Sequence, residues 1–85
     1  MTIEGIYDAA RARGLVRSRR QFSREFLGRA PNYAADAGLR RCSAGALLNL
    51  YCRLGEARQM DLQAAAFARL LDAETRERTA EAAQP

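Results

Sequence analysis

The chain has 85 residues and a net charge of +4, and an apolar fraction of 48% with a charged fraction of 28% is typical of one globular domain. A domain of this size has little room for an enclosed active site, and no apolar run is long enough to span a bilayer. Residues 1–4 lack the basic and then apolar pattern of a secretory signal, so we expect a cytoplasmic protein.

Positive charge is concentrated in one segment. Residues 11–41 contain nine of the fourteen arginines and only two acids, Glu25 and Asp36, which gives this segment a charge of +7. All fourteen basic residues are arginine, but the eighteen alanines beside them indicate a GC-rich coding bias. The position of the arginines, rather than their type, therefore predicts an anionic partner.

The sequence contains no recognisable catalytic or metal-binding group. Cys42 and Cys52 are ten residues apart and there is no histidine, so neither the spacing nor the ligand number of a zinc site is present. We interpret both cysteines as small buried apolar residues. Ser23 and Ser43 lack a histidine that would activate them, and the acids form no catalytic pair. We expect no cofactor, no metal and no enzymatic activity.

The absence of alternating apolar and polar residues predicts an all-α fold, a compact bundle of about five helices. The first helix is expected over residues 3–13, ended by Gly14, after which Leu15 and Val16 enter the core. Its buried face is expected to contain Ile3, Ile6, Tyr7 and Ala10.

The second helix is expected over residues 18–27, because Ser18 and Gln21 match a capping box in which each side chain bonds the other residue's backbone N–H. Gly28 ends it. Its buried residues are expected to be Phe22, Phe26 and Leu27.

A short third helix is expected over residues 31–37, with Pro31 at its first position and Gly38 after its end. Leu39, Arg40 and Arg41 then form a basic loop.

Ser43 is the expected N-cap of the fourth helix, and Gly55 its end. Its apolar face is expected to contain Leu47, Leu50, Tyr51 and Leu54, widened by Leu48. A fifth helix is expected over residues 58–78. Its buried stripe is expected to be Met60, Ala64, Phe67, Leu70 and Leu71, and its exposed ion pairs Asp72–Arg76 and Glu74–Arg78. Residues 1–78 thus form one domain, followed by a frayed tail over residues 79–85.

This order of elements resembles the helix-turn-helix of lambda-repressor-like (Cro/XRE-type) regulators. The resemblance covers about residues 15–54, and its matching positions are Ser18, Gln21, Phe22, Leu27, Gly28, Tyr33, Gly38, Arg40, Arg41, Ser43, Leu47, Leu48 and Leu50. The chain resembles small uncharacterised proteobacterial proteins more closely, through the run of residues 14–16 and Ser18, Phe22, Ser23, Leu27, Gly28 and Tyr33. Ser23 departs from the regulators, which usually have alanine there.

The resemblance implies a lambda-repressor-like core that binds double-stranded DNA, with the third helix in the major groove. Asn32 would then bond an adenine edge and Arg29 a guanine edge. The expected phosphate contacts are Arg17, Arg19, Arg20, Arg40 and Arg41. Tyr33 either joins the DNA contacts or anchors the third helix in the core.

We therefore expect a sequence-specific DNA-binding regulator of transcription. The alternative is a helix-turn-helix-derived module that binds a transcription factor or polymerase subunit, as an antiactivator or adaptor does, without reading DNA. The alanine-rich third helix, whose polar side chains are only Asn32, Tyr33 and Asp36, favours that alternative. If the stripe of the last helix (Met60, Ala64, Phe67 and Leu71) stays exposed, it is expected to join a second copy in a homodimer, or a different protein.

Overall fold

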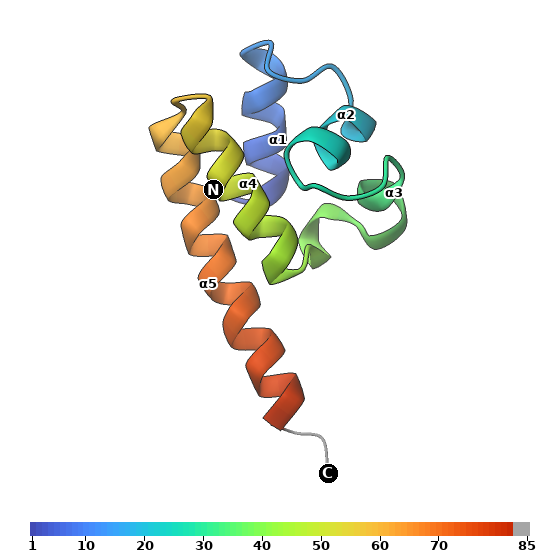
Figure 1. The fold of residues 1–85 in the computed structure, drawn as a ribbon, viewed down its shortest axis with the longest axis vertical. Helices are drawn as coiled ribbons and strands as arrows, with labels where there is room; N and C mark the ends of the chain where they lie inside the picture. Colours follow the sequence, from blue (N-terminus) through green and yellow to red (C-terminus); the bar gives the residue numbers. More distant parts are fainter. Residues whose placement is uncertain (83–85) are drawn as a thin grey trace.

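The computed structural model describes residues 1–82, which form helices and no strands, so the prediction of an all-α fold is confirmed (Figure 1). The elements are α1 (Ile3–Ala12), α2 (Arg19–Glu25), α3 (Tyr33–Ala37), the 3₁₀ turn η1 (Leu39–Arg41), α4 (Ala44–Glu56) and α5 (Met60–Ala82). α4 and α5 form an antiparallel pair, α1 packs beside them, and α2 and α3 lie on the side of the molecule away from α5 (Figure 1).

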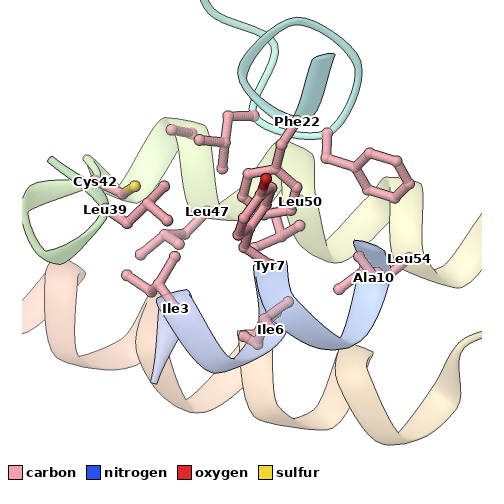
Figure 2. Packing of buried hydrophobic residues seen from close by; sticks show 14 of the residues in the cluster. Ile3, Ile6, Tyr7, Ala10, Phe22, Leu39, Cys42, Leu47, Leu50 and Leu54 are labelled. Carbon is pink, nitrogen blue, oxygen red and sulfur yellow. The ribbon is translucent and has the colours of Figure 1, made fainter. Parts of the chain in front are cut away.

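The core is centred on aromatic and aliphatic side chains from α1, α2 and α4. Tyr7 and Phe22 point toward each other, with their ring centroids 5.3 Å apart in an edge-to-face contact (Figure 2). Phe26 stacks on Phe22 at 5.9 Å. Because these contacts hold α2 against α1, they fix the position of α2 and of the arginines that it carries.

α1 agrees with the prediction. Thr2 caps it by accepting the N–H of Gly5 at 3.0 Å, and Gly14 leaves it at a φ of +76°. Val16 enters the core, and Leu15 packs against it half-buried. The predicted face of α1 is buried throughout: Ile3, Ile6, Tyr7 and Ala10.

α2 begins with the predicted cap, with one change. The Ser18 hydroxyl accepts the N–H of Gln21 at 3.2 Å, but the Gln21 side chain accepts the N–H of Arg17, at 2.7 Å, rather than that of Ser18. The helix ends at Glu25, before the predicted residue 27. Gly28, at a φ of +64°, then turns the chain. The predicted apolar residues are all buried: Phe22, Phe26 and Leu27.

α3 begins at Tyr33, so the prediction that Pro31 is its first residue was wrong. Asn32 occupies the N-cap position without a side-chain capping bond. Instead, the buried hydroxyl of Ser23 accepts the N–H of Ala34 at 3.2 Å. A side chain of α2 therefore supplies the acceptor at the start of α3. The predicted basic loop is the turn η1, which buries Leu39.

α4 is capped by Ser43, whose hydroxyl accepts the N–H of Ala46 at 3.2 Å. It continues through Gly55 to Glu56, because the residue that turns the chain with a φ of +58° is Arg58. Leu48 is 51% exposed and does not widen the core as predicted; it lines a surface hollow with Leu70 and Leu71 of α5. The core contacts of α4 come from Leu47, Leu50 and Leu54, with Tyr51 half-buried.

The predicted buried stripe of α5 was wrong. The helix buries Leu62, Ala66 and Ala73, with Leu70 half-buried, whereas Met60, Phe67 and Leu71 are about half exposed or more and Ala64 is exposed. The small alanines allow the backbones of α4, α1 and α5 to approach closely, so they face the core although the bulkier residues are more apolar.

The ion pairs of α5 differ in part from those predicted. Glu74 and Arg78 are paired at 2.9 Å, as expected. Asp72 instead pairs with Arg69 at 3.0 Å, because the Arg76 guanidinium donates to the Cys42 carbonyl at 3.1 Å. α5 continues to Ala82, through residues 79–82 of the segment predicted to fray, and residues 83–85 lie outside the described part of the chain.

The two cysteines differ in environment. Cys42 is buried as predicted, and burial raises the pKa of its thiol to about 11. Cys52 is exposed on α4, so its predicted burial was wrong. None of the helices formed by residues 1–82 has both the length and the apolar character needed to cross a membrane.

Candidate nucleic-acid interface

Three arginines of the basic segment lie on α2 or just before it. Arg17, Arg20 and Arg24 are exposed and form no ion pair or side-chain hydrogen bond with residues 1–82. Arg20 and Arg24 are one helical turn apart, so their guanidinium groups project from the same face. They line a depression of about 350 Å³ between α2 and the turn at Pro31. Its lining residues are Ser18, Arg20, Gln21, Arg24, Glu25 and Pro31.

Arg24 was not among the predicted site residues, although its spacing of four from Arg20 is a signal that the sequence contains. Arg19, which was predicted, turns toward α1 instead. Its guanidinium lies 4.9 Å from the centre of the Tyr7 ring and 3.6 Å from Glu4. In this arrangement Arg19 holds α2 against α1 rather than projecting outward.

Arg29 lies over the first turn of α4. Its guanidinium donates to the Ser43 hydroxyl at 3.3 Å. A Cβ atom at Gly45 would stand only 2.9 Å from the same guanidinium. The structure therefore places Arg29 at the N-terminus of α4 and not at the start of α3, where a contact with a guanine edge was expected.

The polar side chains of α3 are bound within the protein. The Asn32 amide donates to the carboxylate of Asp36, one turn further along. The Tyr33 hydroxyl accepts the N–H of Ser43 at 3.0 Å, and the ring is half-buried against the core. Of the two roles considered for Tyr33, the geometry thus shows the anchor.

Arg40 and Arg41 project from η1 and are exposed, with no ion pair among the described residues. Arg40 lies near the N-terminus of α1. It lines a depression of about 310 Å³ together with Thr2, Ile3, Arg69 and Asp72. It therefore does not share the depression that Arg20 and Arg24 line.

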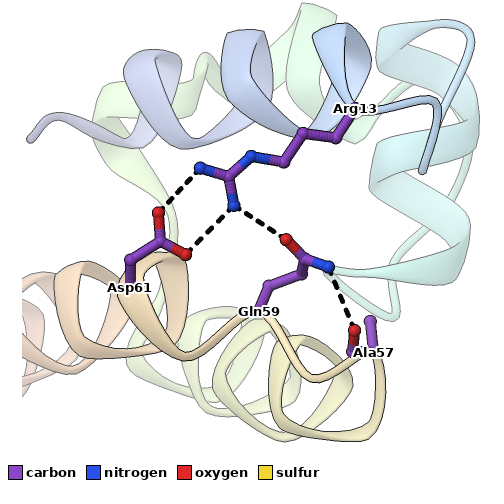
Figure 3. Close-up of polar contacts among 4 residues, drawn as sticks. All are labelled: Arg13, Ala57, Gln59 and Asp61. Atoms are coloured by element: carbon purple, nitrogen blue, oxygen red, sulfur yellow. Dashed lines mark hydrogen bonds and ion pairs between the residues drawn. The ribbon is translucent and has the colours of Figure 1, made fainter.

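Arg13 belongs to the basic segment but is occupied by the start of α5. Its guanidinium donates to the two carboxylate oxygens of Asp61 at 3.0 and 2.7 Å, and to the Gln59 side chain at 2.7 Å (Figure 3). This bidentate pair lowers the pKa of Asp61 to about 2. Arg13 therefore ties the end of α1 to α5, and its charge is not free for an outside partner.

The arginines of residues 11–41 consequently fall into two groups. Arg13, Arg19 and Arg29 are bound within the protein. The exposed arginines without a side-chain partner among residues 1–82 are Arg11, Arg17, Arg20, Arg24, Arg40 and Arg41.

These features define a small all-α protein with exposed arginines at the start of α2, on its outer face and on η1. The chain belongs to the family of unknown function DUF6626, whose model matches residues 3–84. No curated protein and no solved structure matches the chain.

Proposed function

We propose that the protein is a helix-turn-helix-derived regulator that binds double-stranded DNA mainly through its phosphates. The supporting observation is the group of exposed arginines within residues 17–41 that no acid of residues 1–82 neutralises by an ion pair. Its members are Arg17, Arg20, Arg24, Arg40 and Arg41. Exposed guanidinium groups are the usual ligands of phosphate oxygens, and such contacts supply most non-specific affinity for DNA.

Arg20 and Arg24 are the expected centre of this interface. They line one side of a shallow depression and project from the same face of α2, so both can contact phosphates of one strand. Arg40 and Arg41, on η1, are the expected contacts with a more distant part of the backbone.

The position of α3 supports the helix-turn-helix part of the proposal. Ser23 joins α3 to α2, and Tyr33 joins it to the start of α4, so the two helices of the motif are held as a unit. Base reading is the weaker part. Because the Asn32 amide already donates to Asp36, it must exchange that partner for an adenine edge, and we therefore expect a small sequence preference.

The proposal is tested by titrating the protein against a mixed-sequence DNA duplex at about 50 and 200 mM salt. Each phosphate contact contributes about −0.9 to the slope of log affinity against log salt, so five contacts predict a loss of about 500-fold across this range. Binding that is undetectable at the lower salt would exclude the proposal.

A matched control tests whether a change in the salt slope depends on where the arginines lie or only on the net charge of the protein. The double variant Arg20→Ala with Arg24→Ala is expected to reduce the salt slope by about 1.8, since two phosphate contacts are removed. Arg58→Ala with Arg78→Ala removes the same charge from exposed arginines outside residues 11–41, one in the turn between α4 and α5 and one on α5, and is expected to leave the slope unchanged. Equal effects of both double variants would contradict an interface on α2.

A second candidate is an adaptor that binds a transcription factor or polymerase subunit without DNA. The internal hydrogen bonds of Asn32 and Tyr33 favour it, because they leave α3 with few free groups for reading bases. Absence of DNA binding at about 50 mM salt, together with a stoichiometric complex with a purified partner that Arg20→Ala or Phe67→Glu disrupts, would support this candidate over the first.

A further inference from the structure

The largest exposed apolar side chains of the body of the protein lie on the outward faces of α4 and α5. Leu48 is 51% exposed, Met60 57%, Phe67 47% and Leu71 51%. We define the α4–α5 face by the residues Leu48, Tyr51, Met60, Ala64, Phe67 and Leu71. Solvent-exposed apolar groups in a contiguous group, rather than scattered singly, usually mark an interaction surface.

The face is continuous across the two helices. The rings of Tyr51 and Phe67 touch, with centroids 5.8 Å apart, and so connect α4 to α5 in the middle of the face. A hollow of about 310 Å³ lies on one side of this contact, lined by Tyr51, Met60, Gln63, Ala64 and Phe67. A second hollow, of about 350 Å³, is lined by Ala44, Gly45, Leu48, Leu70, Leu71 and Glu74. The face therefore combines exposed apolar side chains with two hollows that are lined partly by apolar residues.

The spacing along α5 fits a second helix packed against it. Met60, Ala64, Phe67 and Leu71 are separated by four, three and four residues, which is the heptad pattern of a coiled-coil seam. The residues that α5 turns toward its own core, among them Leu62 and Ala66, are different ones. α5 thus has one seam used by its own domain and another left open.

An antiparallel copy of α5 would match this seam to itself. With the two-fold axis between Ala64 and Phe67, Met60 of one copy lies opposite Leu71 of the other, and the small Ala64 lies opposite the large Phe67. Two-fold symmetry requires such self-complementarity, because each copy presents the same patch.

Charge also favours a second copy over other occupants. The six residues of the face are uncharged, so two copies meet without like-charge repulsion. Glu74, the charged residue that lines the hollow beside Leu48, is paired with Arg78, so this edge of the face presents no free positive charge to an anionic membrane surface. α2, the helix that carries Arg20 and Arg24, lies on the side of the molecule away from α5, so the α2 helices of the two copies remain apart in the dimer (Figure 1).

The size of the face sets the expected strength of association. The seam on α5, residues 60–71, is about 18 Å long, and two packed helices are about 18 Å wide, which gives about 320 Å² per copy. Two copies together bury about 650 Å², which is less than the roughly 1,000 Å² of a stable specific interface. The dimer is therefore expected to be weak and to form toward the upper end of the concentration range tested below.

We propose that a second copy of this chain occupies the α4–α5 face and forms an antiparallel, two-fold symmetric dimer. Its test is the solution mass of the DNA-free protein by sedimentation equilibrium between about 1 and 500 µM, so the result is independent of the DNA-binding proposal. The wild-type mass is expected to rise from monomer to dimer. A wild-type monomer at all concentrations overturns the proposal.

Phe67→Glu places a charge in the middle of the seam and is expected to remain monomeric across the range. Because Phe67 is about half exposed, the variant is expected to fold, which circular dichroism checks. Ala80→Glu adds the same charge to an exposed position of the same helix outside the face and is expected to dimerise like the wild type. Dimerisation of Phe67→Glu at wild-type strength overturns the proposed face.

The exposed Cys52 provides a second readout beside the α4–α5 face, because it follows Tyr51 directly in the chain. It is one turn from Leu48 on α4, whereas Cys42 is buried and its thiol pKa is raised, so a maleimide reacts with Cys52 first. The rate constant is expected to fall as the wild-type concentration rises and to stay constant for Phe67→Glu. A concentration-independent wild-type rate constant would contradict burial of this face by a second copy.

Discussion

The hydroxyl of Tyr33 accepts the backbone N–H of Ser43 at 3.0 Å, which joins the first residue of α3 to the N-cap of α4. The Ser43 hydroxyl in turn accepts the N–H of Ala46 and a hydrogen bond from Arg29. One short network therefore holds the start of α3, the start of α4 and one arginine of the basic segment. In this network Tyr33 has a structural role that needs no DNA.

Removal of the Tyr33 hydroxyl is expected to weaken the connection between α3 and α4 and so to lower the free energy of unfolding. Tyr33→Phe leaves the half-buried N–H of Ser43 without its acceptor, and a neutral hydrogen bond of this kind contributes about 1 kcal/mol to the free energy of unfolding. Urea denaturation measures the loss. Tyr51→Phe is the control, since the Tyr51 hydroxyl forms no hydrogen bond among residues 1–82, and no loss is expected there. A loss of DNA affinity in Tyr33→Phe without a loss of stability would indicate a direct DNA contact instead.

Ser23 gives a prediction that runs against the family resemblance. The lambda-repressor-like regulators usually have alanine at this position, so the resemblance alone predicts a neutral Ser23→Ala change. The structure predicts destabilisation by about 1–2 kcal/mol, because the N–H of Ala34 is buried and loses its acceptor. Urea denaturation of Ser23→Ala decides between the two. Equal or greater stability would mean that the amide finds another acceptor.

All five helices could be predicted from caps, glycines and apolar spacing, and that spacing also predicted most of the buried residues of α1, α2 and α4. α5 contains two apolar stripes, and periodicity does not distinguish which one faces the core. The bulkier stripe, with Met60 and Phe67, is the one that the sequence predicts to be buried, whereas the core contains the one with Leu62 and the small Ala66. The choice depends on how closely α4 and α1 approach, which is a tertiary property.

The candidate site was predictable in composition but not in geometry. The excess of arginine in residues 11–41 is visible in the sequence, yet which arginines are free depends on partners far away along the chain. Arg13 pairs with Asp61, 48 residues later, and Arg29 bonds Ser43, 14 residues later. Short-range patterns cannot reveal such contacts, whereas the bond of Asn32 to Asp36 follows from their spacing of four.

The Arg13–Asp61 pair predicts a pH dependence of stability. The pKa of Asp61 is lowered from 3.8 to about 2, chiefly by the hydrogen bonds from Arg13. A carboxyl group with a lowered pKa in the folded state stabilises the fold above its unfolded pKa. That contribution is lost as the pH falls from about 4 through 2. Because both side chains are largely exposed, we expect a small effect that added salt weakens.

The measurement is the unfolding free energy of wild type and Asp61→Asn between pH 7 and pH 2. The variant is expected to be less stable than the wild type at pH 7 and to approach it toward pH 2, where about half of the wild-type carboxyl groups are protonated in the folded state. A stability difference that stays constant over this range would show that the pair does not couple folding to protonation.

Replacement by alanine is expected to destabilise the protein more at Gly28, in the turn after α2, than at Gly14, although both glycines have a positive φ. Gly28 and Gly14 both have positive φ, of +64° and +76°, so alanine at either position is strained by about 1 kcal/mol. At Gly14 a Cβ atom meets nothing within 4 Å. At Gly28 it comes within 2.9 Å of the Asn49 side chain, whose amide donates to the Phe26 carbonyl at 2.8 Å.

Gly28→Ala is therefore expected to lose the strain energy and, in addition, the Asn49 hydrogen bond, for a total of about 2 kcal/mol against about 1 kcal/mol for Gly14→Ala. Urea denaturation of both variants measures the difference. The double variant Gly28→Ala with Asn49→Ala tests its cause, because Asn49→Ala alone removes the hydrogen bond and should make the further change at Gly28 no worse than that at Gly14. Full additivity of the two single losses would place the origin of the Gly28 effect elsewhere than in the contact with Asn49.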